Sequence, residues 1–225
     1  MARRGKKYVN TAKKIETKEY TLEQALKVVK TASYSKFGGS VELHVAISLP
    51  KDKDAKSIKG AVSLPHSTAK NVIVAVFATP ENAKAALAAG ADKAGLEDLV
   101  KEVQSGKITF DVAIATPDVM AKIAVLGKEL GPKGLMPNPK TGTVTADVAK
   151  TVKEYKQGKM TFKADEQGGI HIAVGKLDLD DAKIVENIKV AVTAIEEAIG
   201  KSFSTVTRRT YLAPTMGKAV KFKYE

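Results

Sequence analysis

VIVAVFATP, residues 72–80, is the clearest indication of the fold of this 225-residue chain. Its first six residues are all apolar, as in a β-strand whose sheet is covered on both faces. Thr79 and Pro80 follow at once and supply an N-cap and a first-turn proline. Residues 83–89 then continue as a helix that we expect to end at Gly90. The stretch therefore predicts a strand followed directly by a helix.

The same pattern returns at residues 110–117, FDVAIATP, as an apolar strand, a Thr-Pro pair and then a predicted helix towards Leu130. A further helical segment near residues 96–103 lies between the two units. Two strand-to-helix units of this kind are typical of a small parallel α/β domain. We place this domain near residues 67–158.

The part of the chain before this domain has a different pattern. Residues 41–49 alternate between apolar and polar side chains, as in a strand with one buried face, until Pro50 ends the pattern. Thr21 and Gln24 have the spacing of a capping box, which predicts a helix over residues 22–33. Strands with one buried face are typical of an antiparallel sheet.

The part of the chain after Gly158 returns to this alternating pattern. It predicts strands at residues 160–163 and 170–174, joined by a turn at 167–169. A long amphipathic helix over residues 181–199 follows, and then strands to the end of the chain.

The order of these patterns indicates one domain inserted into another. The simplest explanation is a discontinuous α+β domain, residues 1–66 and 159–225, with the α/β domain of residues 67–158 inserted into it. Because the chain crosses between the two domains twice, we expect relative domain motion.

The net charge of the chain, +12, is concentrated at its two ends. Residues 1–18 contribute +6 and residues 201–225 contribute +5, whereas the middle of the chain is nearly neutral. If both ends belong to the discontinuous domain, that domain has a basic face. Such a face attracts polyanions, because each phosphate that Lys or Arg neutralises releases condensed counterions.

The composition argues against several classes of protein. The chain has no cysteine, and His44, His66 and His171 lie far apart in sequence, so we expect no metal site and no cofactor. No apolar h-region follows the basic start, and no apolar run approaches the roughly eighteen residues that span a bilayer. We therefore expect a soluble cytoplasmic protein without a membrane partner.

Two segments imitate enzyme motifs. Residues 67–70, Ser-Thr-Ala-Lys, and residues 140–142, Lys-Thr-Gly, match two elements of penicillin-recognising enzymes, but the Ser-Asp-Asn element is missing. Residues 127–143 form a basic loop rich in Gly and Pro. This loop follows a predicted helix, whereas a phosphate-binding P-loop leaves a strand and opens a helix. A nucleotide-dependent enzyme that uses the α/β domain remains an alternative interpretation.

Two short segments favour contact with nucleic acid. Lys36 and Phe37 place a cation beside an aromatic ring that can stack on an unpaired base, although Phe37 could equally fill the core. Residues 215–217, Thr-Met-Gly, offer a hydroxyl, a flexible apolar side chain and a backbone that RNA can approach closely, next to Lys218. An ordinary turn between two strands is the alternative for this second segment.

Five longer motifs occur in order along the chain: GAVSLPH (60–66), ATPDVM (115–120), LGPKGLMPNPKTGTV (130–144), GGIHIAVG (168–175) and TMG (215–217). Together they resemble the bacterial ribosomal protein L1 family, and the resemblance covers essentially the whole chain. It implies a mixed α/β fold of two domains. The first is a discontinuous α+β domain of the split-βαβ type that binds RNA, and the second is an inserted Rossmann-like α/β domain.

The resemblance also implies a function without catalysis. Members of the family are structural constituents of the large ribosomal subunit and bind large-subunit ribosomal RNA in the mobile stalk near the exit site. They contact deacylated transfer RNA at the exit site and assist its release, and in many bacteria they repress translation of their own messenger RNA. We therefore expect these three RNAs as partners of a cytoplasmic, ribosome-associated protein that is a monomer when free. A free translational repressor without a ribosomal role is a second alternative.

The candidate RNA-binding residues come from the family motifs and from charge. Those that match the family's RNA-contacting positions are Lys36, Phe37, Ser40, Thr215, Met216 and Gly217. His171 lies in a family motif, and Arg208, Arg209 and Lys218 add positive charge near the C-terminal end. The family more often has hydroxyl residues where this chain has Ala213 and Pro214, and proline lacks an amide donor. We expect the lysines and arginines to set affinity, and the Phe37 and Thr-Met-Gly segments to set discrimination.

Overall fold

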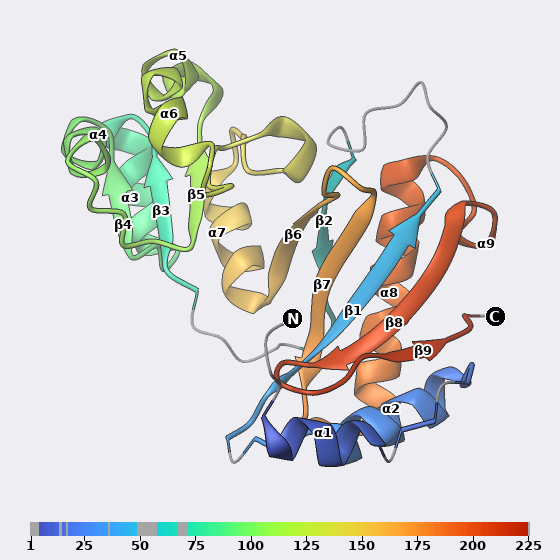
Figure 1. The fold of residues 1–225 in the computed structure, drawn as a ribbon. Coiled ribbons are helices and arrows are strands. Elements are labelled where there is room, and N and C mark those ends of the chain that lie inside the picture. Colours follow the sequence, from blue (N-terminus) through green and yellow to red (C-terminus); the bar gives the residue numbers. More distant parts are fainter. Residues whose placement is uncertain are drawn as a thin grey trace. The chain divides into compact units, whose positions relative to one another are not determined.

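Figure 1 shows the fold of the protein as a computed structural model. The structure describes residues 5–13, 15–16, 18–35, 37–48, 58–66 and 72–224. The contacts within the chain divide it into two compact units, which we call the split unit (Met1–Ala69 with Thr161–Glu225) and the α/β unit (Lys70–Met160). The boundaries expected from the sequence are at residues 66/67 and 158/159. The elements are mixed α and β, as expected.

An antiparallel sheet forms the body of the split unit. Its strands lie in the order β7 (Gly169–Lys176), β1 (Ser40–Ile47), β8 (Thr207–Pro214) and β9 (Val220–Phe222). Buried and half-buried residues alternate along β1, which confirms the predicted strand with one buried face. Helices α2 (Leu22–Ala32) and α8 (Asp181–Ile199) both pack against one face of this sheet (Figure 1).

The ends of these two helices are set by local sequence. Thr21 Oγ1 accepts a hydrogen bond from the Gln24 N–H at 3.4 Å, and Gln24 Oε1 accepts one from the Thr21 N–H at 3.5 Å, so the predicted capping box is confirmed. Helix α8 ends at Gly200, whose φ of 73° is the left-handed conformation common at helix C-termini. The predicted limits of both helices are confirmed to within one residue.

Three elements of the split unit were not predicted. They are α1 (Lys6–Lys13), β2 (Lys59–Ser63) and α9 (Phe203–Val206). Helix α1 has no buried residue among those that the structure describes, so it carries no apolar stripe that periodicity could detect. Strand β2 is only five residues long and pairs with β6 (Lys159–Lys163), a partner from the far side of the insertion.

A parallel sheet forms the centre of the α/β unit, as the sequence predicted. Its strands lie in the order β4 (Lys93–Gly95), β3 (Val74–Phe77) and β5 (Val112–Ala115). All four residues of β3 are buried, because helices cover both faces of the sheet. On one face, Val74 and Val76 contact side chains from α3 (Pro80–Ala88) and α7 (Val148–Gln157).

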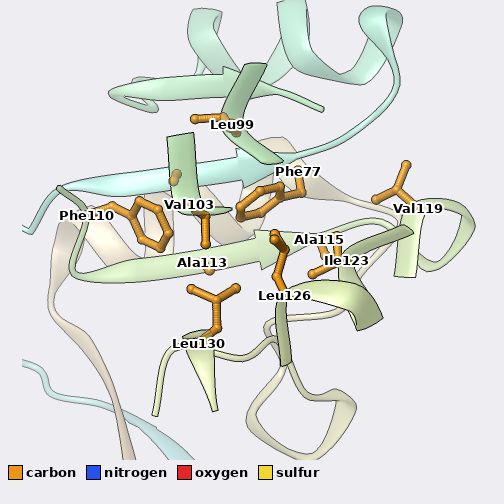
Figure 2. Packing of buried hydrophobic residues seen from close by; sticks show 11 residues of the cluster. Phe77, Leu99, Val103, Phe110, Ala113, Ala115, Val119, Ile123, Leu126 and Leu130 are labelled. Atoms are coloured by element: carbon orange, nitrogen blue, oxygen red, sulfur yellow. The ribbon is translucent and has the colours of Figure 1, made fainter. Parts of the chain in front are cut away.

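The other face of this sheet holds the cluster drawn in Figure 2. Phe77 and Phe110 meet edge to face, with ring centroids 6.1 Å apart. Leu99 and Val103 reach the same cluster from α4 (Glu97–Gln104), whose predicted range of 96–103 is confirmed to within one residue. The apolar run at residues 72–77 is therefore explained by burial on two sides of one short strand.

The single helix predicted after Pro117 is wrong. The structure has four short pieces instead, namely η2 (Pro117–Val119), α5 (Met120–Ile123), η3 (Ala124–Leu126) and α6 (Gly127–Leu130). Val119, Ile123, Leu126 and Leu130 have the spacing of one helical face and all enter the Figure 2 cluster, which is why the sequence looked helical. Gly127 lies where η3 meets α6, and glycine in a helix interior favours such a break.

The two Thr-Pro pairs begin helices, but without the expected caps. Thr79 and Thr116 occupy the N-cap positions of α3 and η2 with an extended backbone. Within the part of the chain that the structure describes, neither side chain accepts a capping hydrogen bond, and the buried Thr116 Oγ1 has no partner. The pairs therefore act through the proline, which fixes φ at the first helical position.

Candidate nucleic-acid interface

Two loops of the split unit meet where β1 begins and β8 ends. The Thr215 N–H donates to the Ser40 carbonyl at 3.0 Å. The Ser40 N–H donates to Thr215 Oγ1 at 2.9 Å, and that hydroxyl lies 3.2 Å from the Ser40 carbonyl. Three hydrogen bonds thus join residues that are 175 positions apart in sequence. We call Phe37, Ser40, Thr215, Met216 and Gly217 the loop surface.

Gly217 is held in a tight turn of this surface. Its N–H donates to the Pro214 carbonyl at 3.0 Å. A Cβ atom at this position would overlap the Pro214 ring and lie 3.0 Å from the Ala32 carbonyl oxygen, so only glycine fits. The turn that the sequence offered as the alternative is present, and it presents Met216 at its tip.

Phe37 and Met216 are the most exposed large apolar side chains of the loop surface, at 72% and 51% exposure. The alternative in which Phe37 fills the core is therefore wrong. The backbone around Phe37 is well bonded, because Ser35 Oγ donates to the Phe37 carbonyl at 2.9 Å and the Leu177 N–H donates to the Gly39 carbonyl at 2.9 Å. Apolar side chains exposed on bonded loops are typical of an interaction site.

Lys218 lies beside the loop surface and also supports α1. Its Nζ is 3.3 Å from the Ile15 carbonyl and 3.5 Å from the Ala12 carbonyl, at the C-terminal end of that helix. A cation is stabilised there by the helix dipole. The carbonyl groups do not neutralise the charge, so Lys218 still contributes positive potential. Lys36 lies outside the described residues.

His171 is placed away from the loop surface, on β7, which is an edge strand of the sheet. It stands opposite His44 in the register of β7 and β1, and the two Nδ1 atoms are 2.7 Å apart, so one ring donates to the other. Burial, reinforced by the neighbouring His171, lowers the pKa of His44, and Glu42 opposes this shift. Among the described residues no group of three or more His, Cys, Asp or Glu side chains is arranged to hold a metal ion.

Arg208 and Arg209 lie at the opposite end of β8 from Thr215. Both are exposed. Arg209 and Thr215 are six positions apart along extended chain, which corresponds to about 20 Å. The predicted RNA-binding residues that the structure describes therefore fall into three places: the loop surface with Lys218, the histidine pair, and this arginine end of β8.

The Gly/Pro-rich loop of the α/β unit folds upon itself. The Asn138 N–H donates to Thr143 Oγ1 at 2.7 Å, and Asn138 Oδ1 accepts from the Lys140 N–H at 2.9 Å. The Tyr155 hydroxyl donates to the Thr141 carbonyl at 3.3 Å. The loop follows helix α6, whereas a P-loop connects a strand to the start of a helix. It therefore differs from a P-loop, as the sequence indicated.

A hollow of about 480 Å³ opens at the carboxyl ends of the three parallel strands of the α/β unit. In open α/β sheets this is where ligands bind. Glu97 and Asp118 bring two carboxylates to the lining, against the single cation of Lys122. This charge does not suit a nucleotide triphosphate.

Among the described helices, none has the length and apolar character to cross a bilayer.

Comparison with known proteins agrees with the motifs. The sequence pattern of the Ribosomal protein L1p/L10e family matches residues 27–218. The chain is 44% identical over 224 residues to "Large ribosomal subunit protein uL1" of Limosilactobacillus fermentum, an alignment that covers 97% of this chain and 96% of that protein. It is 42% identical over 231 residues to the protein of the same name from Kosmotoga olearia, covering 100% and 98%. The chain therefore belongs to the Ribosomal protein L1p/L10e family.

Proposed function

We propose that this protein is a structural component of the large ribosomal subunit that binds large-subunit ribosomal RNA in the mobile stalk near the exit site. Membership of a ribosomal protein family supports a ribosome-associated protein of the cytoplasm without catalytic activity. The family assignment replaces the alternative of a nucleotide-dependent enzyme. Within this proposal, the split unit is the RNA-binding domain of the split-βαβ type and the α/β unit is the inserted Rossmann-like domain.

The observation that carries the proposal is the loop surface. Phe37 and Met216 project from loops that the Thr215 and Ser40 hydrogen bonds hold in place. Because these loops are already ordered, binding loses little further conformational entropy. The Phe37 ring can stack on an unpaired base, and Met216 can fill an irregular apolar surface.

Charged residues complete the proposed interface without reading the sequence of the RNA. Lys36 and Lys218 contact phosphates and set affinity, while the loop surface sets discrimination. His171 has an exposed ring whose Nε2 lies 3.7 Å from Asp165 Oδ2, and it belongs to the proposal as a contact to a 2′-hydroxyl. Gly217 supports this contact indirectly, because only glycine allows the tight turn that presents Met216.

Two further activities belong to the same proposal. At the exit site the protein contacts deacylated transfer RNA and assists its release. It also represses translation of its own messenger RNA, because a surface that recognises the shape of a folded RNA binds any RNA that presents that shape. The alternative of a free repressor without a ribosomal role predicts that the protein is missing from purified large subunits, so its detection there would reject this alternative.

The central test compares two RNAs of equal length over a range of salt. One is a fragment of the large-subunit ribosomal RNA stalk and the other has the same composition in scrambled order. We expect the purified protein to prefer the stalk fragment, and the preference to persist as salt weakens the phosphate contacts. Equal binding of both RNAs, with the same steep dependence on salt, would show that the protein binds only through its charge.

A further inference from the structure

A basic hollow lies at the arginine end of β8, away from the loop surface. It has a volume of about 200 Å³. We call it the arginine pocket; its charged and aromatic lining residues are Arg208, Arg209, Lys221, Lys223, Glu19, Phe203, Phe222 and Tyr224. Four cations and one acid thus surround a space of the size of a few phosphate oxygens and their water.

An irregularity in β8 exposes both arginines. From Thr210 to Pro214, buried and half-buried residues alternate, so a regular strand would turn Arg208 towards the core. The register with β1 instead passes from Arg209, opposite Ala46, to Thr207, opposite Ile47, and leaves out Arg208. This is a β-bulge, a feature that often redirects side chains at functional sites. Its effect is to place two adjacent guanidinium groups on the surface.

The charges of the arginine pocket are only partly balanced. Lys221 forms an ion pair with Glu19. Arg208 and Arg209 have no ion pair or side-chain hydrogen bond with any residue that the structure describes. Like charges held close together repel one another unless an anion lies between them. The fork of N–H donors on each guanidinium group matches the geometry of phosphate.

An aromatic wall bounds the arginine pocket on one side. The rings of Phe203 and Tyr224 meet edge to face, with centroids 5.5 Å apart and planes at 70°. The Tyr224 hydroxyl is protonated at neutral pH, as for any tyrosine, and burial, with a smaller contribution from Glu196, raises its pKa further. A neutral phenol can donate a hydrogen bond to a phosphate oxygen, which a phenolate could not do.

We propose that the arginine pocket is a second anchor for RNA, which binds backbone phosphates of the same folded RNA that the loop surface recognises. This inference rests on the proposed function for the identity of the RNA. The bulge, the phenol and the two arginines, which have no ion-pair partner among the described residues, assign phosphate as the bound group. The arginine pocket lies about 20 Å from the loop surface along β8. Its phosphate contacts therefore orient the RNA and increase affinity, while the loop surface discriminates between RNAs.

Directed cleavage of RNA tests where the RNA lies. The natural chain has no cysteine, so one introduced cysteine can carry an iron–EDTA group that cleaves nearby RNA. Ser204 lines the arginine pocket, Ser35 adjoins the loop surface and the exposed Ser63 on β2 serves as a control. We expect the Ser204→Cys and Ser35→Cys proteins to cleave different segments of the bound stalk RNA, and Ser63→Cys to give neither pattern.

The outcomes of this experiment separate the two proposals. Cleavage from Ser35→Cys alone would overturn the second anchor and leave the proposed function standing. The absence of specific cleavage from both positions would count against the proposed function itself. Cleavage of the same RNA segment from both positions would also overturn the second anchor, because a single short RNA contact would then explain the cleavage from both cysteines.

Affinity measurements test the chemistry of the pocket. We expect Arg208→Ala with Arg209→Ala to weaken binding of stalk and scrambled RNA alike, by roughly ten- to a hundred-fold near 0.1 M salt, and to reduce the salt slope by about two. The preference for stalk RNA should remain. The matched control, Lys27→Ala with Lys163→Ala, removes the same charge from exposed positions of the split unit. An equal effect of the control would overturn a specific phosphate site.

Discussion

At its C-terminal end, β8 leads into the loop surface, where the polar groups of Thr215 and Ser40 bond to each other and apolar side chains are exposed. At its N-terminal end, β8 leads into the arginine pocket, where two guanidinium groups have no ion pair with any described residue. Hydrogen bonds within the protein fix a shape, whereas unpaired charges attract any polyanion. The comparison indicates that recognition and attachment are separate properties of the two ends of one strand.

The largest effect is expected when a charge is introduced into the loop surface, because this removes the difference between the two ends of β8. Met216→Asp places a carboxylate where we expect RNA, so the preference for stalk RNA should fall by roughly a hundred-fold, the scale of a binding hot spot. Binding curves for stalk and scrambled RNA measure the effect. Val190→Asp, at another exposed apolar position of the split unit, is the control and should bind as the natural protein does. Unchanged affinity in a folded Met216→Asp protein would remove the loop surface from the interface.

A second variant tests the tight turn beneath Met216. Gly217→Ala adds a Cβ that overlaps Pro214 and approaches the Ala32 carbonyl, so we expect a loss of about 1–3 kcal/mol in the free energy of unfolding. Urea denaturation measures this loss. Adding Pro214→Ala removes one of the two close contacts and should restore part of the stability. A Gly217→Ala protein as stable as the natural one would show that the turn relaxes freely.

The hydrogen bonds between the two loops can be removed without adding charge. Thr215→Val keeps the shape of the side chain but loses the hydroxyl bonds to Ser40. We expect the free energy of unfolding to fall by about 1 kcal/mol, and stalk RNA binding to weaken about ten-fold because the loops are no longer held in place. Thr215→Ser restores the hydroxyl and should recover both properties. If Thr215→Ser binds as weakly as Thr215→Val, the methyl group and not the hydroxyl is responsible.

Lys218 combines the properties of the two ends, because it forms hydrogen bonds within the protein and also carries a charge that can attract RNA. Lys218→Met removes a cation from the carbonyl groups at the end of α1, and we expect a loss of about 0.5–1 kcal/mol in the free energy of unfolding. The salt slope of RNA binding should fall by about one, because the natural charge is not neutralised within the protein. A change in stability without a change in slope would confine Lys218 to supporting α1.

The smallest effect is expected at the histidine pair, which lies between the two ends. Because the pKa of His44 is lowered in the folded protein, the unfolded chain takes up this proton at a higher pH. Its contribution therefore makes the protein less stable as pH falls through the ordinary histidine range, and stability is regained as pH rises. Urea midpoints at pH 5.5 and 7.5 should differ less in His44→Gln than in the natural protein. An identical difference in both proteins would contradict the assignment.

Local patterns in the sequence were sufficient for the main elements of the fold. The capping box at Thr21 marks the start of a helix, the alternation along β1 has the period of a strand, and the apolar run of β3 is typical of a strand covered on both faces. The same patterns missed α7 (Val148–Gln157), although Asp147 caps it and Val148, Thr151, Val152 and Tyr155 are buried along one face. That signal was present in the sequence.

The candidate site was only partly predictable. Phe37 and the Thr215, Met216 and Gly217 segment were found both by residue type and by family resemblance. No local pattern could show that Phe37 would be exposed, since an aromatic residue before a strand fits the core equally well. The members of the arginine pocket other than the two arginines were missed, because Glu19, Phe203 and Tyr224 come together only when distant segments pack.

Composition and periodicity thus established a basic, mixed α/β protein, since charge and the repeats of helices and strands belong to neighbouring residues along the chain. The tertiary structure alone established which residues share a surface. The bond between Ser40 and Thr215 joins positions 175 residues apart, and the bulge at Arg208 arises from the register between β1 and β8. Both depend on how strands from distant parts of the sequence pair, because hydrogen bonds between strands depend on spatial alignment and not on sequence separation.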